Sequence, residues 1–209
     1  MNEEQKIIQK YFLPIANNPE SLQLSNDAAF INKKKNMVIS SDMMIEDIHF
    51  DRLDDPFCLA QKLLRVNLSD IAAMGAKPYG YMLNLSLPKL NHKLWLKKFC
   101  KGLAEDTKKF NLKLFGGDLG SSKNIFMSVT ILGLVSQQFH KKMIGHEGSE
   151  IFVSNTLGDA GIGLQIKKGK FSKLKKPVKN FFLSKLNTPI PQIKLGKSLL
   201  GIADFCKDI

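Results

Sequence analysis

The segment from Pro56 to Gly75 limits the possible folds of this chain more than any other part of the sequence. Pro56 suits the first turn of a helix, and Gly75 with Pro78 shortly after it suits a helix end. Between them the apolar residues keep the three- and four-residue spacing of one helix face: Ala60, Leu63, Leu64, Leu68 and Ile71. A long helix with such a face must pack against a sheet or against other helices.

One carboxylate interrupts this apolar helix. Asp70 lies in the run Asn67-Leu68-Ser69-Asp70, close to the C-terminal end of the helix. The helix macrodipole disfavours negative charge at that end, so something must compensate for the carboxylate. A bound metal ion would do so, which makes Asp70 the first candidate metal ligand in the sequence.

Short apolar runs and helix-like segments alternate along the rest of the chain. We expect strands over residues 36–41, 81–87, 112–115 and 125–135, and helices over residues 3–13 and 92–110. A polar stretch, residues 137–148, follows the last of these strands. Beyond it we expect a strand over residues 151–154, a helix entered from a glycine-rich turn, a basic loop over residues 167–179 and a final helix over residues 191–206.

This distribution predicts an α+β protein in two parts. Residues 1–136 contain most of the sheet and are expected to form an N-terminal domain with a mixed sheet and flanking helices. Residues 137–209 are expected to form part of a second, α/β domain. The chain has 209 residues, which is enough for one large domain and part of another.

The strongly basic composition does not by itself predict a nucleic-acid partner. The net charge is +12, but Arg52 and Arg65 are the only arginines and all other basic residues are lysines. Lysine-rich surfaces are usually solvated, whereas base and phosphate recognition commonly uses the guanidinium group. We therefore expect no nucleic-acid partner, although the positive charge would attract anionic nucleotides.

The sequence predicts neither a membrane segment nor a secretion signal. No apolar run approaches the roughly 20 residues of a membrane helix, and the N-terminus mixes acidic and basic residues without an apolar stretch. The three cysteines, Cys58, Cys100 and Cys206, are scattered and have no metal or redox spacing. These features favour reduced thiols and a cytoplasmic location.

Three further aspartates occupy positions where alternating α/β structures display functional groups. Asp27 follows a polar turn, Asp42 follows the first expected strand, and Asp118 follows two glycines at another strand end. Each also has a structural explanation as an Asx turn, a helix cap or a plain turn residue. Together with the hydroxyls of Ser40 and Ser41, they offer the oxygen ligands that Mg²⁺ prefers. Mg²⁺ in turn suits a substrate rich in phosphate oxygens.

Other local features narrow the class of nucleotide site. Gly116 and Gly117 would let the backbone approach a ligand closely. The sequence contains neither a Gly-x-x-x-x-Gly-Lys-Ser/Thr loop nor a protein-kinase catalytic loop, which argues against both of those classes. His49 follows Asp42 by seven residues. Since a single histidine is commonly structural or solvated, the residues alone leave its role open.

Four motifs together resemble the thiamine-monophosphate kinases, a family of the aminoimidazole-ribonucleotide-synthetase-like superfamily. The run from Ser40 to Phe50 resembles the family pattern (S/T)-(S/T)-D-x-x-x-x-x-x-H-F, and the run from Val66 to Pro78 resembles V-N-L-S-D-(I/L)-A-A-M-G-A-x-P. Residues 116–118 resemble G-G-D, and residues 156–164 resemble T-x-G-D-(A/S)-x-x-G-L. The N-L-S-D run is common to the superfamily, whereas the His-Phe element and the order of the motifs indicate the thiamine family.

The resemblance implies an ATP- and Mg²⁺-dependent phosphorylation of thiamine monophosphate to thiamine diphosphate, with no nucleophile on the protein. It implies that a cluster of Mg²⁺ ions is bound by Asp27, Ser40, Ser41, Asp42, Asp70, Asp118 and Asp208. It implies ATP contacts at Gly117, Asp118 and Lys142, and a substrate contact at His49. It also implies an aminoimidazole-ribonucleotide-synthetase-like N-terminal domain, and a homodimer in which two N-terminal sheets join into a barrel near the sites.

Several positions depart from the family pattern. Ser25-Asn26-Asp27 replaces an expected Gly-Asp-Asp, and Leu119-Gly120-Ser121 replaces an expected Thr-x-Arg. An arginine is missing near Lys142, and two more are missing from residues 187–192. Because guanidinium groups bind phosphates strongly, their loss predicts weaker nucleotide binding.

The sequence stops at Asp208-Ile209, where the family continues as D-(I/V)-S-D-G-L. We therefore expect a C-terminally truncated member with little activity by itself. Two alternatives stay open. One is a catalytically inactive remnant that keeps the dimerising fold, and the other is a superfamily relative that acts on another phosphate-accepting substrate.

Overall fold

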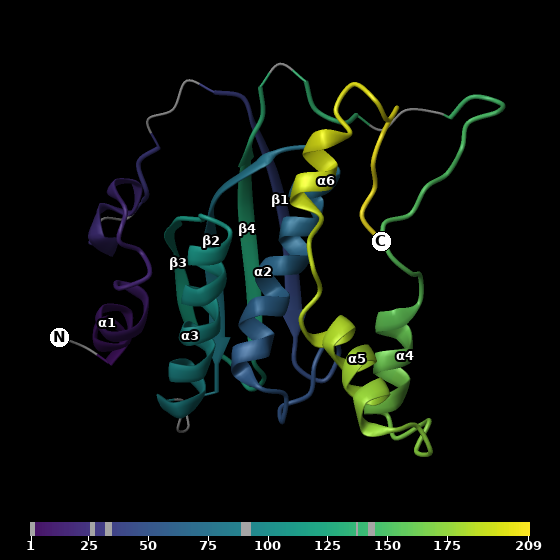
Figure 1. The fold of residues 1–209 in the computed structure, drawn as a ribbon. Coiled ribbons are helices and arrows are strands. Elements are labelled where there is room, and N and C mark those ends of the chain that lie inside the picture. Colours follow the sequence, from purple (N-terminus) through teal and green to yellow (C-terminus); the bar gives the residue numbers. More distant parts are fainter. Residues whose placement is uncertain (1–2, 26–27, 32–34, 89–92, 137, 142–144) are drawn as a thin grey trace.

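A four-stranded mixed sheet forms the centre of the computed structural model, which describes all residues except 1–2, 26–27, 32–34, 89–92, 137 and 142–144. The strands lie in the order β1-β4-β2-β3 (Figure 1). Their bounds are β1 Met37–Ile45, β2 Lys77–Leu87, β3 Leu114–Ser121 and β4 Phe126–Leu134. β4 is antiparallel to both of its neighbours, whereas β2 and β3 are parallel.

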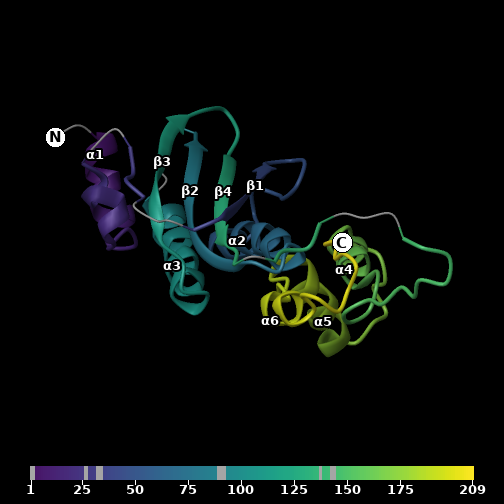
Figure 2. The same cartoon turned by 90° about the horizontal axis from the view of Figure 1, so that it is seen from above.

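Two long helices, α2 (Pro56–Ala73) and α3 (Lys93–Lys109), cover one face of this sheet (Figure 2). α2 begins as the sequence indicates, with Pro56 in its first turn and Asp55 as the N-cap that accepts a hydrogen bond from the Phe57 amide. The two helices approach closely at Gly102. A Cβ on that residue would lie 2.3 Å from the Phe57 carbonyl oxygen, so α3 needs a glycine there.

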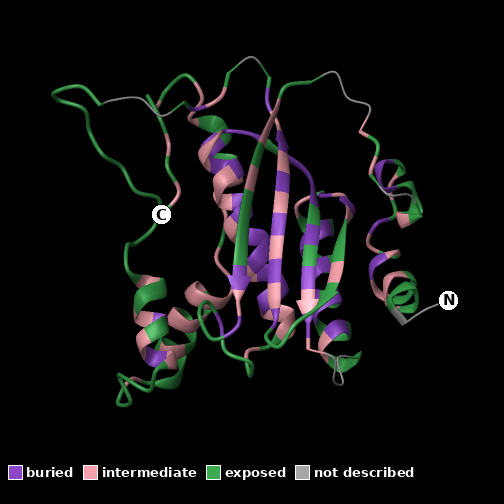
Figure 3. Cartoon of the chain, turned by 180° about the vertical axis from the view of Figure 1, so that it is seen from behind, coloured by how far each residue is buried: buried purple, intermediate pink, exposed green. Residues whose placement is uncertain are grey.

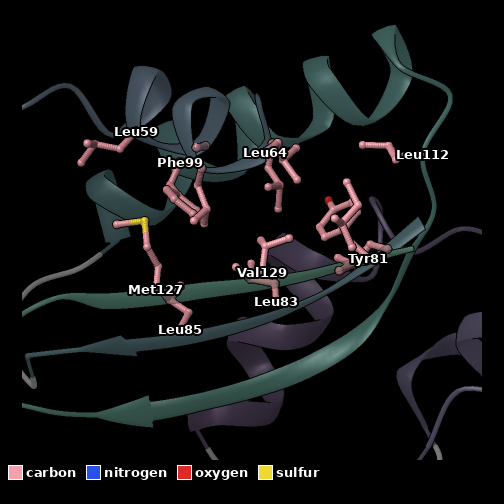
Figure 4. Close-up of a cluster of buried hydrophobic side chains, with 14 of the residues drawn as sticks. Leu59, Leu64, Tyr81, Leu83, Leu85, Phe99, Leu112, Met127 and Val129 are labelled. Atoms are coloured by element: carbon pink, nitrogen blue, oxygen red, sulfur yellow. The ribbon is translucent and has the colours of Figure 1, made fainter. Parts of the chain in front are cut away.

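The hydrophobic core lies between the helix pair and the sheet (Figure 4). Residues of β4 are buried in strict alternation, as expected for a strand with one face on the core. The expected apolar face of α2 is confirmed, since its leucines are fully buried. The best-buried members of the core are Leu63, Leu64, Leu68, Tyr81, Phe99, Leu103, Met127, Val129 and Ile131.

The N-terminal segment covers part of the edge strand β3. It consists of α1 (Glu3–Ile7), a π-helical turn η1 (Ile8–Phe12) and a 3₁₀ segment η2 (Pro19–Leu24). Asn18 donates from Nδ2 to the Leu114 carbonyl at 2.9 Å, and buried Glu20 accepts hydrogen bonds from the Tyr79 hydroxyl and the Lys113 ammonium. This cover shields only the start of the edge strand, at Leu114.

The C-terminal segment packs beside α2 rather than under the sheet (Figures 1 and 2). It contains α4 (Asp159–Lys167), α5 (Lys176–Asn187) and α6 (Ile193–Ser198). Lys167 forms ion pairs with Asp51 at 2.8 Å and with Asp54 at 2.5 Å, which ties α4 to the loop before α2. None of the helices in the described ranges combines the length and apolar character needed to cross a membrane.

The long elements expected from the sequence are present, but three strand bounds differ from the prediction. β2 begins at Lys77, four residues before the expected start. β1 continues to Ile45 and β3 continues to Ser121, so Asp42 and Asp118 lie within strands rather than at their ends. Pairing with β4 extends β1, and pairing with β2 extends β3. A sequence window cannot reveal this, because strand length depends on which neighbour is available.

The expectations for the C-terminal segment are less accurate. Residues 151–154 form no strand, because no strand of the described sheet lies beside them. α5 replaces the end of the expected basic loop, and the last helix spans only Ile193–Ser198. The chain turns at Gly201, whose φ of 77° does not continue a helix. The domain boundary near residue 136 stays a prediction.

A buried ion pair joins α2 to α3. Arg65 donates from Nε to Asp106 Oδ2 at 2.6 Å and from Nη2 to Oδ1 at 2.9 Å, and Gln61 donates to Oδ1 at 3.2 Å. The Asp106 side chain is fully buried. Arg65 also donates from Nη1 to the Thr188 carbonyl at 3.3 Å, so the same pair holds the chain that leads to α6.

Asp106→Ala is expected to lower the free energy of unfolding by about 3–5 kcal/mol, because it leaves the Arg65 guanidinium buried without its counter-charge. Urea denaturation followed by circular dichroism measures this loss. Lys98→Ala is the control, since Lys98 pairs with Asp55 at 3.9 Å on the surface. Loss of an exposed pair costs about 1 kcal/mol or less, so equal losses in the two variants would contradict the prediction.

Candidate metal and nucleotide site

The contact between β1 and α2 brings together side chains that the sequence marks as metal ligands. Asp70 lies near the end of α2, and its Oδ2 accepts a hydrogen bond of 2.5 Å from the Ser40 hydroxyl on β1. Asp42 lies two residues after Ser40 and therefore points to the same face of the strand. The strand and the helix thus present two carboxylates and a hydroxyl to one another.

Asn67 fixes the relative position of these two elements. Its side chain is fully buried, with Oδ1 accepting a hydrogen bond from the Asp42 amide at 3.0 Å and Nδ2 donating to the Leu63 carbonyl at 2.8 Å. Asn67 and Asp70 are three residues apart, so they share one face of α2. In the sequence Asn67 is visible only as part of a motif. The one signal of its role is a polar amide within a largely apolar helix, three residues before Asp70.

The C-terminal segment brings a third carboxylate to the same place. Asp208 lies within hydrogen-bonding reach of Asp70, and the charge of Asp42 also acts on it. Burial and then the negative charge of Asp70 raise the pKa of Asp208, and the same two causes raise the pKa of Asp42. Ser40, Asp42, Asp70 and Asp208 are called the carboxylate cluster below.

The carboxylate cluster has negative charge without a protein cation to balance it. Among the described residues, none of the ion pairs involves its three carboxylates. In the same part of the chain, no three acidic, histidine or cysteine side chains stand close enough to form a complete coordination shell. Carboxylates and a hydroxyl are nevertheless the oxygen ligands that a hard cation such as Mg²⁺ prefers. A cation would also relieve the repulsion that raises the two pKa values.

Asp118 lies on the opposite face of the sheet. It is in register with Asn84 on β2, and the same row continues through Ser128 on β4 to Met43 on β1. Residues of one row share a face, so Asp42, the neighbour of Met43, points to the other side. β3 and β1 are also the two edge strands, three inter-strand spacings of about 4.8 Å apart. The expectation that Asp118 converges with Asp42 and Asp70 within one chain is therefore wrong.

Ser41 and Gly117 have structural partners in the sheet. Ser41 faces the same side as Asp118, and its hydroxyl donates to the Val129 carbonyl at 3.0 Å. Gly117 has a φ of 151°, and a Cβ there would lie 1.7 Å from the Leu83 carbonyl oxygen. The pairing of β3 with β2 thus requires a glycine at this position, whatever else the residue contacts.

The remaining candidates are not brought to the cluster by contacts in the structure. His49 lies beyond the end of β1, where its side chain is exposed and Nδ1 accepts a hydrogen bond from the Ile45 amide at 3.1 Å. This contact closes the turn after β1. Asp27 and Lys142 lie outside the described residues.

Comparison with known proteins identifies the family to which this sheet and carboxylate cluster belong. The family model described as AIR synthase related protein, N-terminal domain, matches residues 25–135, which include Ser40, Asp42 and Asp70. The chain belongs to this family.

Two curated relatives are thiamine-monophosphate kinases. The chain is 36% identical over 212 residues to the enzyme of Haemophilus influenzae, and the alignment covers 97% of this chain and 62% of the relative. It is 32% identical to that of Buchnera aphidicola subsp. Acyrthosiphon pisum, over 99% of this chain and 65% of the relative. The chain therefore spans less than two thirds of the length of these two proteins.

Solved structures show the same fold. Thiamine-monophosphate kinase from Stenotrophomonas maltophilia K279a matches 93% of this chain and 62% of its own with a TM-score of 0.77 at 28% identity. AaThiL complexed with AMPPCP and TMP matches 86% of this chain and 58% of its own with a TM-score of 0.72 at 25% identity. The expected fold class and the family resemblance are thus confirmed.

Asp42→Asn is expected to raise the melting temperature of the metal-free chain near neutral pH. The pKa of Asp42 is raised above its ordinary value of 3.8 in the folded state. Stability from this group is therefore complete below the unfolded pKa and is lost as pH rises through the folded pKa. Asparagine removes the charge that causes this loss.

Thermal unfolding in a chelator, followed by circular dichroism at several pH values, measures the difference between Asp42→Asn and the natural chain. The gain should shrink as the pH falls toward the pKa of Asp42, because the natural side chain is then protonated. Asp204→Asn is the control, since it removes an exposed carboxylate outside the cluster. A neutral-pH melting temperature that falls in Asp42→Asn, or rises equally in Asp204→Asn, would refute this account.

Proposed function

We propose that this chain is part of a thiamine-monophosphate kinase, which transfers the γ-phosphoryl group of ATP to thiamine monophosphate and yields thiamine diphosphate. The observation that carries the proposal is the carboxylate cluster between β1 and α2. Family membership supports it, together with the names of the curated relatives and the AMPPCP and TMP bound in one solved relative.

Ser40, Asp42, Asp70 and Asp208 would hold Mg²⁺, which neutralises phosphate charge during phosphoryl transfer when bound. In the reaction, an oxygen of the substrate phosphate forms a bond to the γ-phosphorus while the bond to the bridging oxygen of ADP breaks. The protein needs no nucleophile, and its contribution is positioning and charge. Asn67 supports this by fixing the Asp42 backbone before any ligand arrives.

The finer assignments follow the same proposal. Gly117, Asp118 and Lys142 would contact ATP, Ser41 and Asp27 would complete the metal cluster, and His49 would contact the substrate. We also infer a cytoplasmic location, because the three cysteines are free thiols, which suits a reducing compartment. Burial raises the pKa of Cys100 to about 12, so that thiol is unreactive.

Asp70→Asn is expected to abolish Mg²⁺-dependent nucleotide binding while leaving the fold intact, because Asp70 is the carboxylate that Ser40 and Asp208 both adjoin. Isothermal titration with Mg²⁺ and AMPPCP measures binding, and a coupled ADP-release assay with thiamine monophosphate measures turnover. Asp204→Asn is the matched control, an exposed aspartate outside the cluster.

Nucleotide binding and ADP release together test the kinase against the two alternatives, an inactive remnant and a superfamily relative with another substrate. ADP release that requires both thiamine monophosphate and Mg²⁺ and is lost in Asp70→Asn supports the kinase. Binding without ADP release is expected both of a truncated kinase and of an inactive remnant, whereas ADP release with a different phosphate acceptor supports another member of the superfamily. If the natural chain binds neither Mg²⁺ nor AMPPCP, the proposal fails.

We further propose that the chain forms a homodimer through the face of the sheet that α2 and α3 leave uncovered (Figure 3). This open face presents apolar side chains to solvent, with Ile39 66% exposed, Met43 53% and Met82 41%. Exposed apolar patches of this kind commonly mark interfaces. β1 and β3 are the two edges of the sheet. In a barrel made from two sheets, the β3 edge of one copy would lie beside the β1 edge of the other. Asp118 of one copy would then lie near the carboxylate cluster of the other copy.

Met82→Lys is expected to convert the dimer into a monomer, because it places a charge in the middle of the proposed interface. Sedimentation velocity measures the change. Leu53→Lys is the control, since Leu53 is equally apolar and 97% exposed but lies in the loop before α2. A natural chain that sediments as a folded monomer at high concentration would contradict the dimer.

The same dimer predicts complementation between two inactive variants. Asp70→Asn and Asp118→Asn chains, mixed and allowed to exchange, should form hybrids with one intact site, so Mg²⁺–AMPPCP binding should reappear. Each variant alone should bind weakly. If mixing restores nothing while the hybrids form, Asp118 does not act across the dimer.

A further inference from the structure

A buried histidine connects the two elements that carry Asp70 and Asp208. His140 is 5% exposed and lies in the segment after β4. Its backbone amide donates to the Met74 carbonyl at the end of α2 at 3.3 Å, and its Nε2 lies 2.9 Å from the Gly196 carbonyl oxygen on α6. Asp70 precedes Met74 by one helical turn, and the chain from α6 leads directly to Asp208.

The hydrogen bond between His140 and Gly196 has a defined direction, and it satisfies a carbonyl group at the end of α6. A carbonyl oxygen can only accept, so the proton is on Nε2 of His140. Gly196 lies near the C-terminal end of α6, where carbonyl groups lack N–H partners from a following turn. The Leu200 amide, which would be that partner, donates to the Lys197 carbonyl instead. His140 therefore satisfies a buried helix-end carbonyl that the helix itself leaves open.

The contact between α2 and α6, in which His140 takes part, is tightly packed. A Cβ on Gly196 would lie 1.9 Å from the Ala72 carbonyl oxygen, so α6 rests directly on the backbone of α2. A Cβ on Gly75 would lie 2.7 Å from Leu200 Cδ2 and 3.1 Å from His140 Cδ2. These five residues are called the α2–α6 joint. Because the joint is close-packed, a change in one contact shifts α6 relative to α2.

We propose that His140 is a positioning residue for the carboxylate cluster: its hydrogen bond to Gly196 seats α6 on α2 and thereby brings Asp208 to Asp70. The part of this inference that concerns Mg²⁺ rests on the proposed function, whereas the seating of the C-terminal segment does not. An apolar side chain of similar size would fill the space but would leave the Gly196 carbonyl without a donor.

The first test compares Mg²⁺ affinity, measured by isothermal titration with Mg²⁺ alone, in three variants. His140→Leu keeps the bulk and removes the donor, and is expected to bind Mg²⁺ about tenfold more weakly, as when a group that orients a metal ligand is lost. His140→Gln keeps a nitrogen donor near the Nε2 position and should restore most of the affinity. His146→Ala, an exposed histidine of the same connecting segment, should bind like the natural chain.

The second test needs no metal. Cys206 is two residues before Asp208 and partly exposed, so its rate of reaction with a small disulfide reagent reports on the seating of the C-terminal segment. The measurement is made in a Cys58→Ser background, because Cys58 is also partly exposed whereas Cys100 is buried. His140→Leu should react several-fold faster than the natural chain, and His140→Gln should not.

A double-mutant cycle separates positioning from general loss of structure. In an Asp208→Asn background, His140→Leu should cause no further loss of Mg²⁺ affinity, because the ligand that it positions is already gone. A loss of the same size in both backgrounds would overturn the proposal, as would unchanged Mg²⁺ affinity together with an unchanged Cys206 rate.

Two further outcomes are decisive. If the natural chain binds no Mg²⁺ but His140→Leu still accelerates the Cys206 reaction, the proposed metal site fails and the positioning role of His140 stands. Should leucine prevent folding, His140→Asn replaces it, since the shorter amide retains polarity but cannot reach the Gly196 carbonyl. Natural behaviour of a folded His140→Asn chain in both tests would overturn the inference.

Discussion

The register of β1 against α2 is the constraint on which the candidate site depends. α2 is held by its buried leucines, but burial alone would allow the strand to slide along the helix. Pairing with β4 fixes β1 within the sheet, and the hydrogen bond from the Asp42 amide to the fully buried Asn67 side chain fixes it against α2. With this register fixed, Ser40 meets Asp70 at 2.5 Å and Asp42 comes alongside. A polar contact inside an apolar interface thus decides the geometry of the charged groups at its rim.

The same arrangement has a cost that other parts of the molecule must offset. Three carboxylates lie together without a protein cation, and burial, followed by the negative charge of Asp70, raises the pKa values of Asp42 and Asp208. The Arg65–Asp106 pair, the close helix contacts and the α2–α6 joint hold the surrounding elements in place despite this cost. Such unbalanced charge is typical of binding sites, where the ligand supplies the missing charge.

The two faces of the sheet divide the candidate site residues of the chain into separate groups. Ser40 and Asp42 point toward α2, whereas Ser41 and Asp118 point to the open face with Ile39, Met43 and Met82. A site that needs both groups cannot be completed by one sheet. A second copy against the open face offers one solution, and it would also cover apolar side chains that are otherwise exposed to water.

The sequence by itself determined the long helix, the strands of the core and the residue types that suit a hard cation. Apolar periodicity and motif spacing are local properties, and a single chain displays them directly. Only the tertiary structure decided that β1 and β3 run past Asp42 and Asp118, that these aspartates face opposite sides, and that Asn67 and His140 hold the site together. Strand order, register and helix contacts depend on partners far away in the sequence. The face that an aspartate occupies is therefore set by pairing that no local pattern records.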